Sequence, residues 1–163
     1  MKKLTPMKPR VLSPGEFFFS QDGGEVRTLL GSCVAITLWH PRRRLGGMCH
    51  YLLPSAGRPI GQDLDGRYGD QAMELFLAAL KRTRTEPREF QVKVFGGGNM
   101  FPNTSQQSGV GDKNIEAAFR LLKQYGFPAP ESHVGCNGHR TVILDLETGN
   151  TWLRWNNGKN SSW

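Results

Sequence analysis

Cysteine, acidic residues and long apolar segments are all scarce in this sequence of 163 residues. Its three cysteines cannot all pair within one chain, so we expect free thiols in a reducing compartment rather than a disulfide framework. The sequence has no run of about 18 or more apolar residues, which argues against a transmembrane helix and against membrane insertion. The basic start lacks the apolar segment of a secretory signal, and we therefore expect a cytoplasmic protein.

The 14 acidic residues are outnumbered by 21 lysines and arginines, which gives a formal net charge of +7. Basic side chains gather in two stretches, at residues 42–44 and 81–88. They are either solvated surface or sites that attract a polyanion or an acidic protein, and charge alone does not choose. Because neither stretch is interleaved with aromatic side chains, as a platform for stacked bases would be, we expect no nucleic acid partner.

Length and composition predict one domain with a substantial core. A domain of this size buries roughly two-thirds of the surface that its unfolded chain exposes. The hydrophobic fraction of 37% and the 20 glycines suit a turn-rich fold that contains strands. We expect this domain over residues 11–155, between a flexible basic tail at residues 1–10 and a flexible tail at residues 156–163.

Apolar periodicity places the elements. Within residues 11–20, the apolar stretch 17–19 predicts a strand that is entered through Pro14-Gly15. Further strands are predicted at residues 26–30, 33–39, 45–53, 90–95, 131–136, 140–146 and 151–155, with a hairpin turn at Asn137-Gly138. One helix is predicted from Asp70 as N-cap, with a buried stripe of Met73, Phe76, Leu77 and Leu80. A second runs from about Asp112 to Tyr125, buries Ile115, Ala118, Phe119 and Leu122, and ends at Gly126.

Two apolar runs on either side of residues 41–44 predict an antiparallel hairpin that organises the chain. If the turn is centred between Pro41 and Arg42, Leu38 pairs with Leu45 and Cys33 pairs with His50. Directly opposed residues have β-carbons about 4.5–5.5 Å apart, which is close enough for a thiol and an imidazole to interact. This register therefore predicts a nucleophile and a base side by side on one face.

A thiol beside an imidazole has a defined chemistry. The histidine can lower the pKa of the thiol until thiolate is available, and the thiolate attacks a carbonyl. Gly31 and Ser32 form a turn before Cys33, and the backbone N–H groups of this turn could hold the developing oxyanion. The alternative is that Cys33 is a small buried hydrophobe, as most free cysteines are, and His50 a residue of the sheet with satisfied hydrogen bonds.

Two other patterns predict no ligand. The glycine-rich stretch at residues 96–101 follows a strand but lacks the Gly-Lys-Ser/Thr ending of a phosphate-binding loop. We expect its glycines to bring the backbone close to the hairpin or to adopt positive φ. His133, Cys136 and His139 straddle a tight turn and lack the paired spacing and fourth ligand of a zinc site, so we expect no metal.

Several short motifs, in order along residues 11–155, resemble the CheD family of chemoreceptor glutamine deamidases. They occupy residues 30–35, 46–54, 67–70, 93–101, 111–115 and 138–142. The resemblance implies Cys33 as nucleophile, His50 as base and Thr28 as the residue that orients the histidine. Cys49 stands where the family often has asparagine and Cys136 where it often has glycine, which makes Cys49 a rival thiol to test.

The resemblance also implies a reaction and a fold. A glutamine on the cytoplasmic helical region of a methyl-accepting chemotaxis receptor would become glutamate through a thioester, without a metal or organic cofactor. Weak methylesterase activity and a CheC-type phosphatase partner are further expectations, and the alternative is a non-catalytic adaptor of the chemotaxis pathway. The expected fold class is α+β, with layered, mostly antiparallel β-sheets in a sandwich-like arrangement and two α-helices packed on one face.

Overall fold

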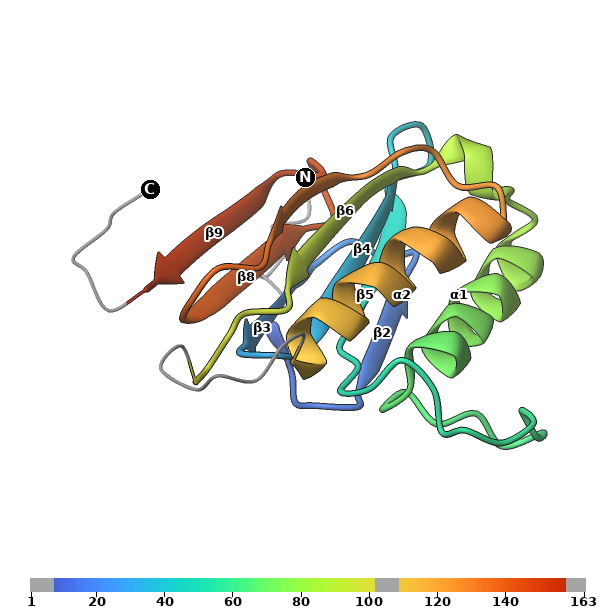
Figure 1. The fold of residues 1–163 in the computed structure, drawn as a ribbon. Coiled ribbons are helices and arrows are strands. Elements are labelled where there is room, and N and C mark those ends of the chain that lie inside the picture. The colour runs from blue at the N-terminus through green and yellow to red at the C-terminus, as the bar shows by residue number, and fades with distance from the viewer. Residues whose placement is uncertain (1–7, 102–108, 158–163) are drawn as a thin grey trace.

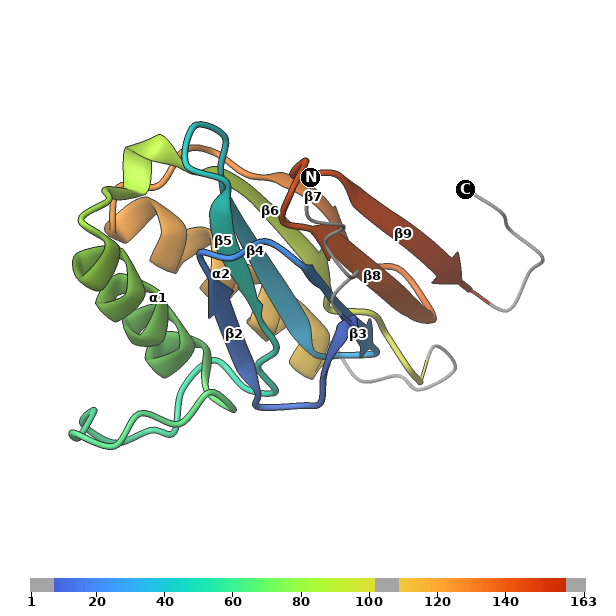
Figure 2. The same cartoon turned by 180° about the vertical axis from the view of Figure 1, so that it is seen from behind.

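The computed structural model describes residues 8–101 and 109–157, which form three layers (Figure 1). Helices α1 (Gly69–Thr83) and α2 (Val110–Gln124) cover one face of a five-stranded sheet. A four-stranded sheet lies on the opposite side, as the view from behind shows (Figure 2). The predicted α+β class, with layered sheets and two helices on one face, is confirmed. No helix in the described part of the chain is long and apolar enough to cross a membrane.

The five-stranded sheet has the order β2-β5-β4-β6-β7 and the four-stranded sheet the order β1-β3-β8-β9. Pairs β1–β3 and β6–β7 are parallel, and the other pairs among the described strands are antiparallel. The strand bounds are β1 Arg10–Leu12, β2 Phe17–Ser20, β3 Glu25–Leu30, β4 Val34–His40, β5 Leu45–Cys49, β6 Gln91–Gly96, β7 Glu131–Val134, β8 His139–Asp145 and β9 Thr151–Asn156. A short 3-10 helix, Pro87–Glu89, precedes β6. The predicted tails at residues 1–10 and 156–163 lie mostly outside the described residues.

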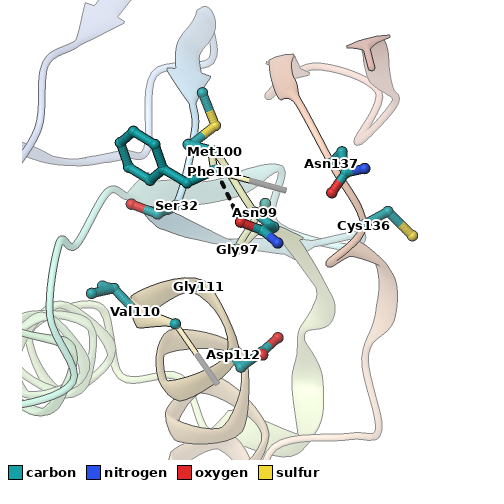
Figure 3. Close-up of a pocket in the computed structure, with 12 residues that line it drawn as sticks. Ser32, Gly97, Asn99, Met100, Phe101, Val110, Gly111, Asp112, Cys136 and Asn137 are labelled. Atoms are coloured by element: carbon teal, nitrogen blue, oxygen red, sulfur yellow. Dashed lines mark hydrogen bonds between the residues drawn. The ribbon is translucent and has the colours of Figure 1, made fainter. Parts of the chain in front are cut away.

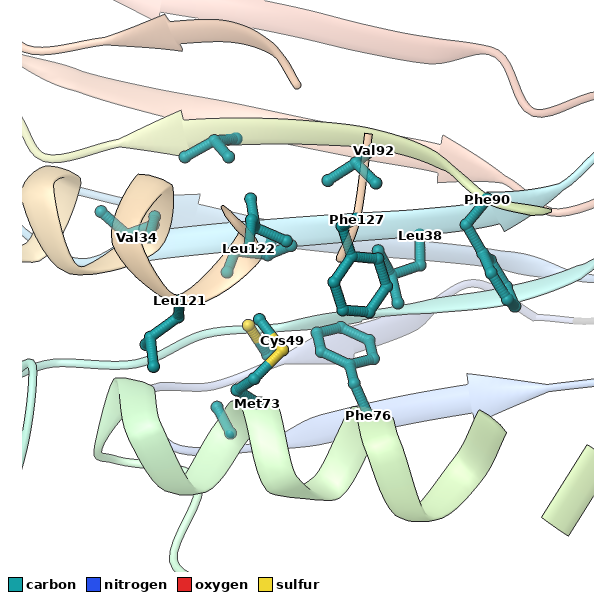
Figure 4. Close-up of a cluster of buried hydrophobic side chains, with 14 of the residues drawn as sticks. Val34, Leu38, Cys49, Met73, Phe76, Phe90, Val92, Leu121, Leu122 and Phe127 are labelled. Atoms are coloured by element: carbon teal, nitrogen blue, oxygen red, sulfur yellow. The ribbon is translucent and has the colours of Figure 1, made fainter. Parts of the chain in front are cut away.

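Strand β4 is central because it is buried on both faces. Val34, Ile36 and Leu38 belong to a core cluster shared with the two helices (Figure 4). Ala35 belongs to a second cluster, which fills the space between the two sheets. A strand that is covered on both faces has a nearly continuous apolar sequence, which explains the residues at positions 34–38. The alternation along β4 therefore tells which side chains face the helices and which face the second sheet.

The predictions at the two places where the chain changes sheets had different outcomes. The strand expected at residues 17–19 after Pro14-Gly15 is present as β2; a further short strand, β1, precedes this turn, in which Gly15 adopts φ +87°. Strands β7 and β8 do not form the expected hairpin: β7 pairs with β6, whereas β8 pairs with β3 and β9. The left-handed backbone extends over Gly135 and Cys136 as well as Gly138, so it redirects the chain between layers instead of closing a two-residue turn.

Both helices form, with differences at their starts and in the second stripe. Helix α1 begins after Tyr68 without a side-chain cap, so Asp70 lies in the first turn and is not the N-cap. Phe119 is 37% exposed, contrary to prediction. Ala118 and Leu122 are buried as predicted and Ile115 is partly buried against the same core. The rest of the buried face is formed by Gly111, Asn114, Ala117 and Leu121. Gly126 does follow the end of α2, with φ +80°.

Phe76 and Phe119 provide a matched test of this packing. Phe76 is fully buried in the cluster under the helices, and its ring lies 4.9 Å from that of Phe17. We expect Phe76→Ala to lower the free energy of unfolding by about 3–5 kcal/mol, and Phe119→Ala to lower it by less than about 1 kcal/mol. Urea unfolding measured by circular dichroism gives both values. Equal losses for the two variants would contradict the assignment of the buried face of α2.

Candidate active site

The β4–β5 hairpin positions Cys33 and His50, with a register different from the predicted one. Leu38 pairs with Gly47, and the last bridge of the hairpin joins Val34 to Tyr51. The predicted pairing is wrong by two residues because the turn contains all four residues 41–44, closed by a 2.8 Å hydrogen bond from the Arg44 N–H to the His40 carbonyl. A slip of two residues leaves every side chain on its expected face.

Cys33 and His50 lie on the same face of the five-stranded sheet, toward the other sheet. Cys33 packs against the cluster between the sheets, to which Met48, two residues before His50, also belongs. Thr28, on strand β3 of the opposite sheet, reaches His50 directly. Cys49 faces the other way, into the core under the helices (Figure 4). Burial raises its pKa to about 12, so this rival thiol is not ionised near neutral pH.

The hydrogen bonds of Thr28 determine which nitrogen of His50 carries the proton. Thr28 Oγ1 lies 2.6 Å from Nδ1 of His50 and 2.9 Å from the carbonyl oxygen of Leu12. A carbonyl oxygen only accepts, so the single hydroxyl proton of Thr28 goes to Leu12, and Nδ1 donates its own proton to Oγ1. The neutral imidazole is therefore protonated on Nδ1, and Nε2 keeps a free lone pair.

Burial keeps both reactive groups uncharged. Nε2 of His50 is buried and has no hydrogen-bond partner among the described residues, Cys33 included. Desolvation lowers the pKa of His50 from 6.5 to about 4, and the nearby carboxylate of Glu16 opposes this only in part. Desolvation also raises the pKa of the Cys33 thiol, contrary to the expectation that the histidine lowers it. The resting site thus holds a neutral thiol and a neutral imidazole.

Backbone hydrogen bonds hold the turn before Cys33 against the glycine-rich loop. Gly98 N–H donates to the Gly31 carbonyl at 2.9 Å, and Gly97 N–H donates to the Cys33 carbonyl at 2.8 Å. The Ser32 carbonyl accepts from the side chain of Asn114 at 3.0 Å. Gly97 has φ +66°, so the expectation that these glycines allow close approach and positive φ is confirmed.

A pocket of about 430 Å³ opens beside this turn (Figure 3). Its lining comes from Ser32, the loop residues 97–101, the start of α2 at residues 109–112, and Cys136 with Asn137. The side chains of Met100, Phe101 and Val110 are exposed. Ser32, which directly precedes Cys33, contributes to this lining, whereas the Cys33 side chain packs toward the cluster between the sheets.

The three residues considered for a metal do not form a site. Nδ1 of His133 accepts a 2.8 Å hydrogen bond from Nε of Arg140, which occupies that nitrogen. Over residues 8–101 and 109–157, the structure shows no group of three or more His, Cys, Asp or Glu side chains that could hold a metal ion. Cys136 is exposed and lines the pocket instead.

Sequence reasoning assigned no role to two groups that contact the site. One is the Leu12 carbonyl, which sets the direction of the Thr28 proton and which no sequence pattern marks. The other is Asn114, which lies within the motif at residues 111–115. Its signal is a polar residue at a position of the helix that the spacing of Gly111, Ala118 and Leu121 marks as buried.

Fold and site together define a class: a three-layer α+β protein whose central hairpin presents a thiol and an imidazole to the second sheet. A family model described as CheD chemotactic sensory transduction matches residues 52–155. This chain belongs to the CheD family.

Relatives agree with this assignment, and one solved structure is similar in fold. A Pseudomonas syringae pv. tomato protein named probable chemoreceptor glutamine deamidase CheD is 48% identical, over 88% of this chain and 87% of that protein. A Dechloromonas aromatica protein named probable chemoreceptor glutamine deamidase CheD 3 is 45% identical, over 90% and 87% respectively. The crystal structure of YlmD from Geobacillus stearothermophilus is similar with a TM-score of 0.51 at 13% identity, over 79% of this chain and 59% of that chain. This last likeness shows the fold alone.

The three thiols should differ in their accessibility to an alkylating reagent. Iodoacetamide should modify exposed Cys136 and half-buried Cys33 in the native protein, whereas Cys49 should react only after unfolding in urea. Peptide mass spectrometry after a timed reaction measures each site. Modification of Cys49 at the rate of Cys33 in the native state would contradict its placement under the helices.

The low pKa of His50 should make stability depend on pH. Between pH 6.5 and about 4 the unfolded chain binds a proton at His50 that the folded chain does not, so stability is full above this range and falls within it. From pH 7 to pH 5 we expect a loss of about 2 kcal/mol in the free energy of unfolding from this group. Urea unfolding at both pH values should show this loss in the native protein, and a correspondingly smaller one in His50→Gln. The same pH dependence in both proteins would contradict the assignment.

Proposed function

We propose that this protein deamidates glutamine side chains of chemoreceptors, with Cys33 as nucleophile, His50 as base and Thr28 as the residue that orients His50. The observation that carries the proposal is the hydrogen bond from His50 Nδ1 to Thr28, which leaves Nε2 unprotonated on the face that Cys33 shares. The names of the relatives supply the substrate class.

In the first half-reaction, the Cys33 thiol attacks the carboxamide carbon of the glutamine. Because both groups are neutral at rest, Nε2 of His50 takes the thiol proton as the sulfur–carbon bond forms, and no stored ion pair is required. Negative charge develops on the amide oxygen, close to the backbone N–H groups of the turn formed by Gly31, Ser32 and Cys33. The imidazolium then protonates the amide nitrogen, the carbon–nitrogen bond breaks, and ammonia leaves a thioester.

In the second half-reaction, water replaces ammonia. Nε2 of His50 takes a proton from the water as its oxygen bonds to the thioester carbon, and the carbon–sulfur bond then breaks. The imidazolium returns its proton to the sulfur, which regenerates the Cys33 thiol. The net change is the hydrolysis of glutamine to glutamate and ammonia. The same thioester forms from a glutamate methyl ester with loss of methanol, so weak methylesterase activity belongs to the proposal.

The resemblance to the family supports the remaining parts of the proposal. The substrate glutamines lie on the cytoplasmic helical region of methyl-accepting chemotaxis receptors, and the enzyme works in the cytoplasm. A CheC-type phosphatase is the regulatory partner. No cofactor enters the reaction, because the thiol, the imidazole and water supply each proton and each bond.

Incubation of the protein with a receptor fragment, followed by peptide mass spectrometry, tests the reaction. Conversion of glutamine to glutamate should occur with the native protein and be abolished in Cys33→Ala. Thr28→Ser keeps the hydroxyl group and should retain most activity, whereas Thr28→Val should lose at least about tenfold in kcat because the imidazole is no longer oriented.

The two threonine variants differ by one hydroxyl group, so each is a control for the other. Full activity of Cys33→Ala would show that the nucleophile is wrong. Equal activity of Thr28→Val and Thr28→Ser would show that the bond to His50 has no part in the reaction. A native protein that binds the fragment but leaves its glutamines intact would indicate an adaptor.

A further inference from the structure

Asn114 is a fully buried side chain that contacts both segments of the hairpin that carry the reactive groups. Its Nδ2 donates to the carbonyl of Ser32 at 3.0 Å and to the carbonyl of Leu52 at 2.8 Å. Both partners can only accept, so the amide nitrogen must face them, and its two protons match the two acceptors. Oδ1 of Asn114 has no hydrogen-bond partner among the described residues.

These contacts lie where the hairpin loses its own hydrogen bonds. Val34 and Tyr51 exchange the last pair of backbone hydrogen bonds, at 3.1 and 3.0 Å. Beyond that pair, the Leu52 N–H turns away to the carbonyl of Arg67. Asn114 therefore supplies the next link between the two segments. That link lies one residue before Cys33 and two residues after His50.

The bond to Ser32 also determines the direction of the Cys33 N–H group. A trans peptide unit is planar, with its C=O and N–H on opposite sides. Since the Ser32 carbonyl points to α2, the Cys33 N–H points away from α2, and the Cys33 side chain also lies on that side of the sheet. The Cys33 N–H donates to no acceptor in the described part of the chain. It is free to bind the oxyanion that forms on the amide oxygen when the sulfur attacks.

We propose that Asn114 is a positioning residue for the deamidation: it aims the Cys33 N–H at the developing oxyanion and holds the segments of Cys33 and His50 at a set distance. The inference rests on the proposed function and adds a residue outside the Cys33, His50 and Thr28 set. A displacement of about 1 Å at such a site costs on the order of 100-fold in rate, so the effect belongs to kcat.

Asn114→Asp is the most direct test because it keeps the shape and replaces the donor with an acceptor. We expect kcat for a receptor fragment to fall at least about tenfold, with KM changed by less than about threefold. Asn114→Ala should behave in the same way. The ratio of Asn114→Asp activity to native activity should rise as the pH falls, because a protonated carboxyl group donates one of the two lost hydrogen bonds.

Tyr51→Phe is the matched control. It removes the 2.6 Å hydrogen bond from the Tyr51 hydroxyl to the backbone carbonyl of Asn114, and leaves the bonds to Ser32 and Leu52 intact. We expect its kcat to stay within about threefold of the native value. Thermal unfolding measured for all variants sets an assay temperature at which each is folded.

The outcomes separate this inference from the proposed function. If the native protein leaves the receptor fragment unchanged, the proposed function fails. If the native protein is active and folded Asn114→Asp keeps its kcat, or Tyr51→Phe loses as much, the positioning role is overturned. Should both Asn114 variants fail to fold, proton exchange of the Asn114 side-chain amide in the native protein decides. Slow exchange supports a clamp held by two carbonyls, and exchange as fast as that of an exposed amide overturns it.

Discussion

The hydrogen bond between Thr28 and His50 is the interaction on which the site depends, because it links the two sheets at the reactive imidazole. Thr28 lies on β3, and its proton goes to Leu12 on the neighbouring strand β1. Two strands of one sheet therefore fix the tautomer of a residue on the other sheet. The apolar cluster between the sheets sets their spacing, and any change in that spacing also changes the 2.6 Å contact between Thr28 and His50. The packing between the two sheets therefore also determines which nitrogen of His50 carries the proton.

The burial of His50 and Cys33 removes charge from the resting site. Desolvation moves the pKa of His50 down and that of Cys33 up, and both shifts oppose an imidazolium–thiolate pair. In the proposed reaction, charge develops only while the sulfur attacks, where the Cys33 N–H and its neighbours can bind it. An exposed thiolate is open to oxidation at all times, whereas a half-buried neutral thiol becomes a strong nucleophile only when a base takes its proton. A neutral thiol and imidazole are less reactive than an ion pair, but the thiol becomes nucleophilic only when the imidazole takes its proton.

The resemblance to the family implied the layered α+β class, and the residue pattern predicted both helices and the face shared by Cys33 and His50. The shared face was predicted from the alternation along residues 34–38. Because side chains alternate with a period of two, a register error of two residues left each side chain on its predicted face. An error of one residue would have placed Cys49 on the face of His50. The failures have two causes. The register of the β4–β5 hairpin depended on how many residues its turn contains, and the Asn137-Gly138 hairpin depended on which sheet the chain joins next. Local pattern contains neither choice. Asn114 escaped notice because its partners are backbone carbonyls, which the identity of the residues does not display.

Each of the three layers contributes different residues to the site. The middle sheet carries Cys33 and His50, the outer sheet holds the imidazole through Thr28, and the helical layer holds the Ser32 and Leu52 carbonyls through Asn114. Each outer layer contributes one polar side chain that is buried and directed at the end of the central hairpin. A hairpin covered by only one layer would leave either the base or the turn before the nucleophile without a fixed partner. The burial of β4 on both faces, which follows from its uninterrupted apolar sequence, is thus also what allows the reactive groups to be held from both sides.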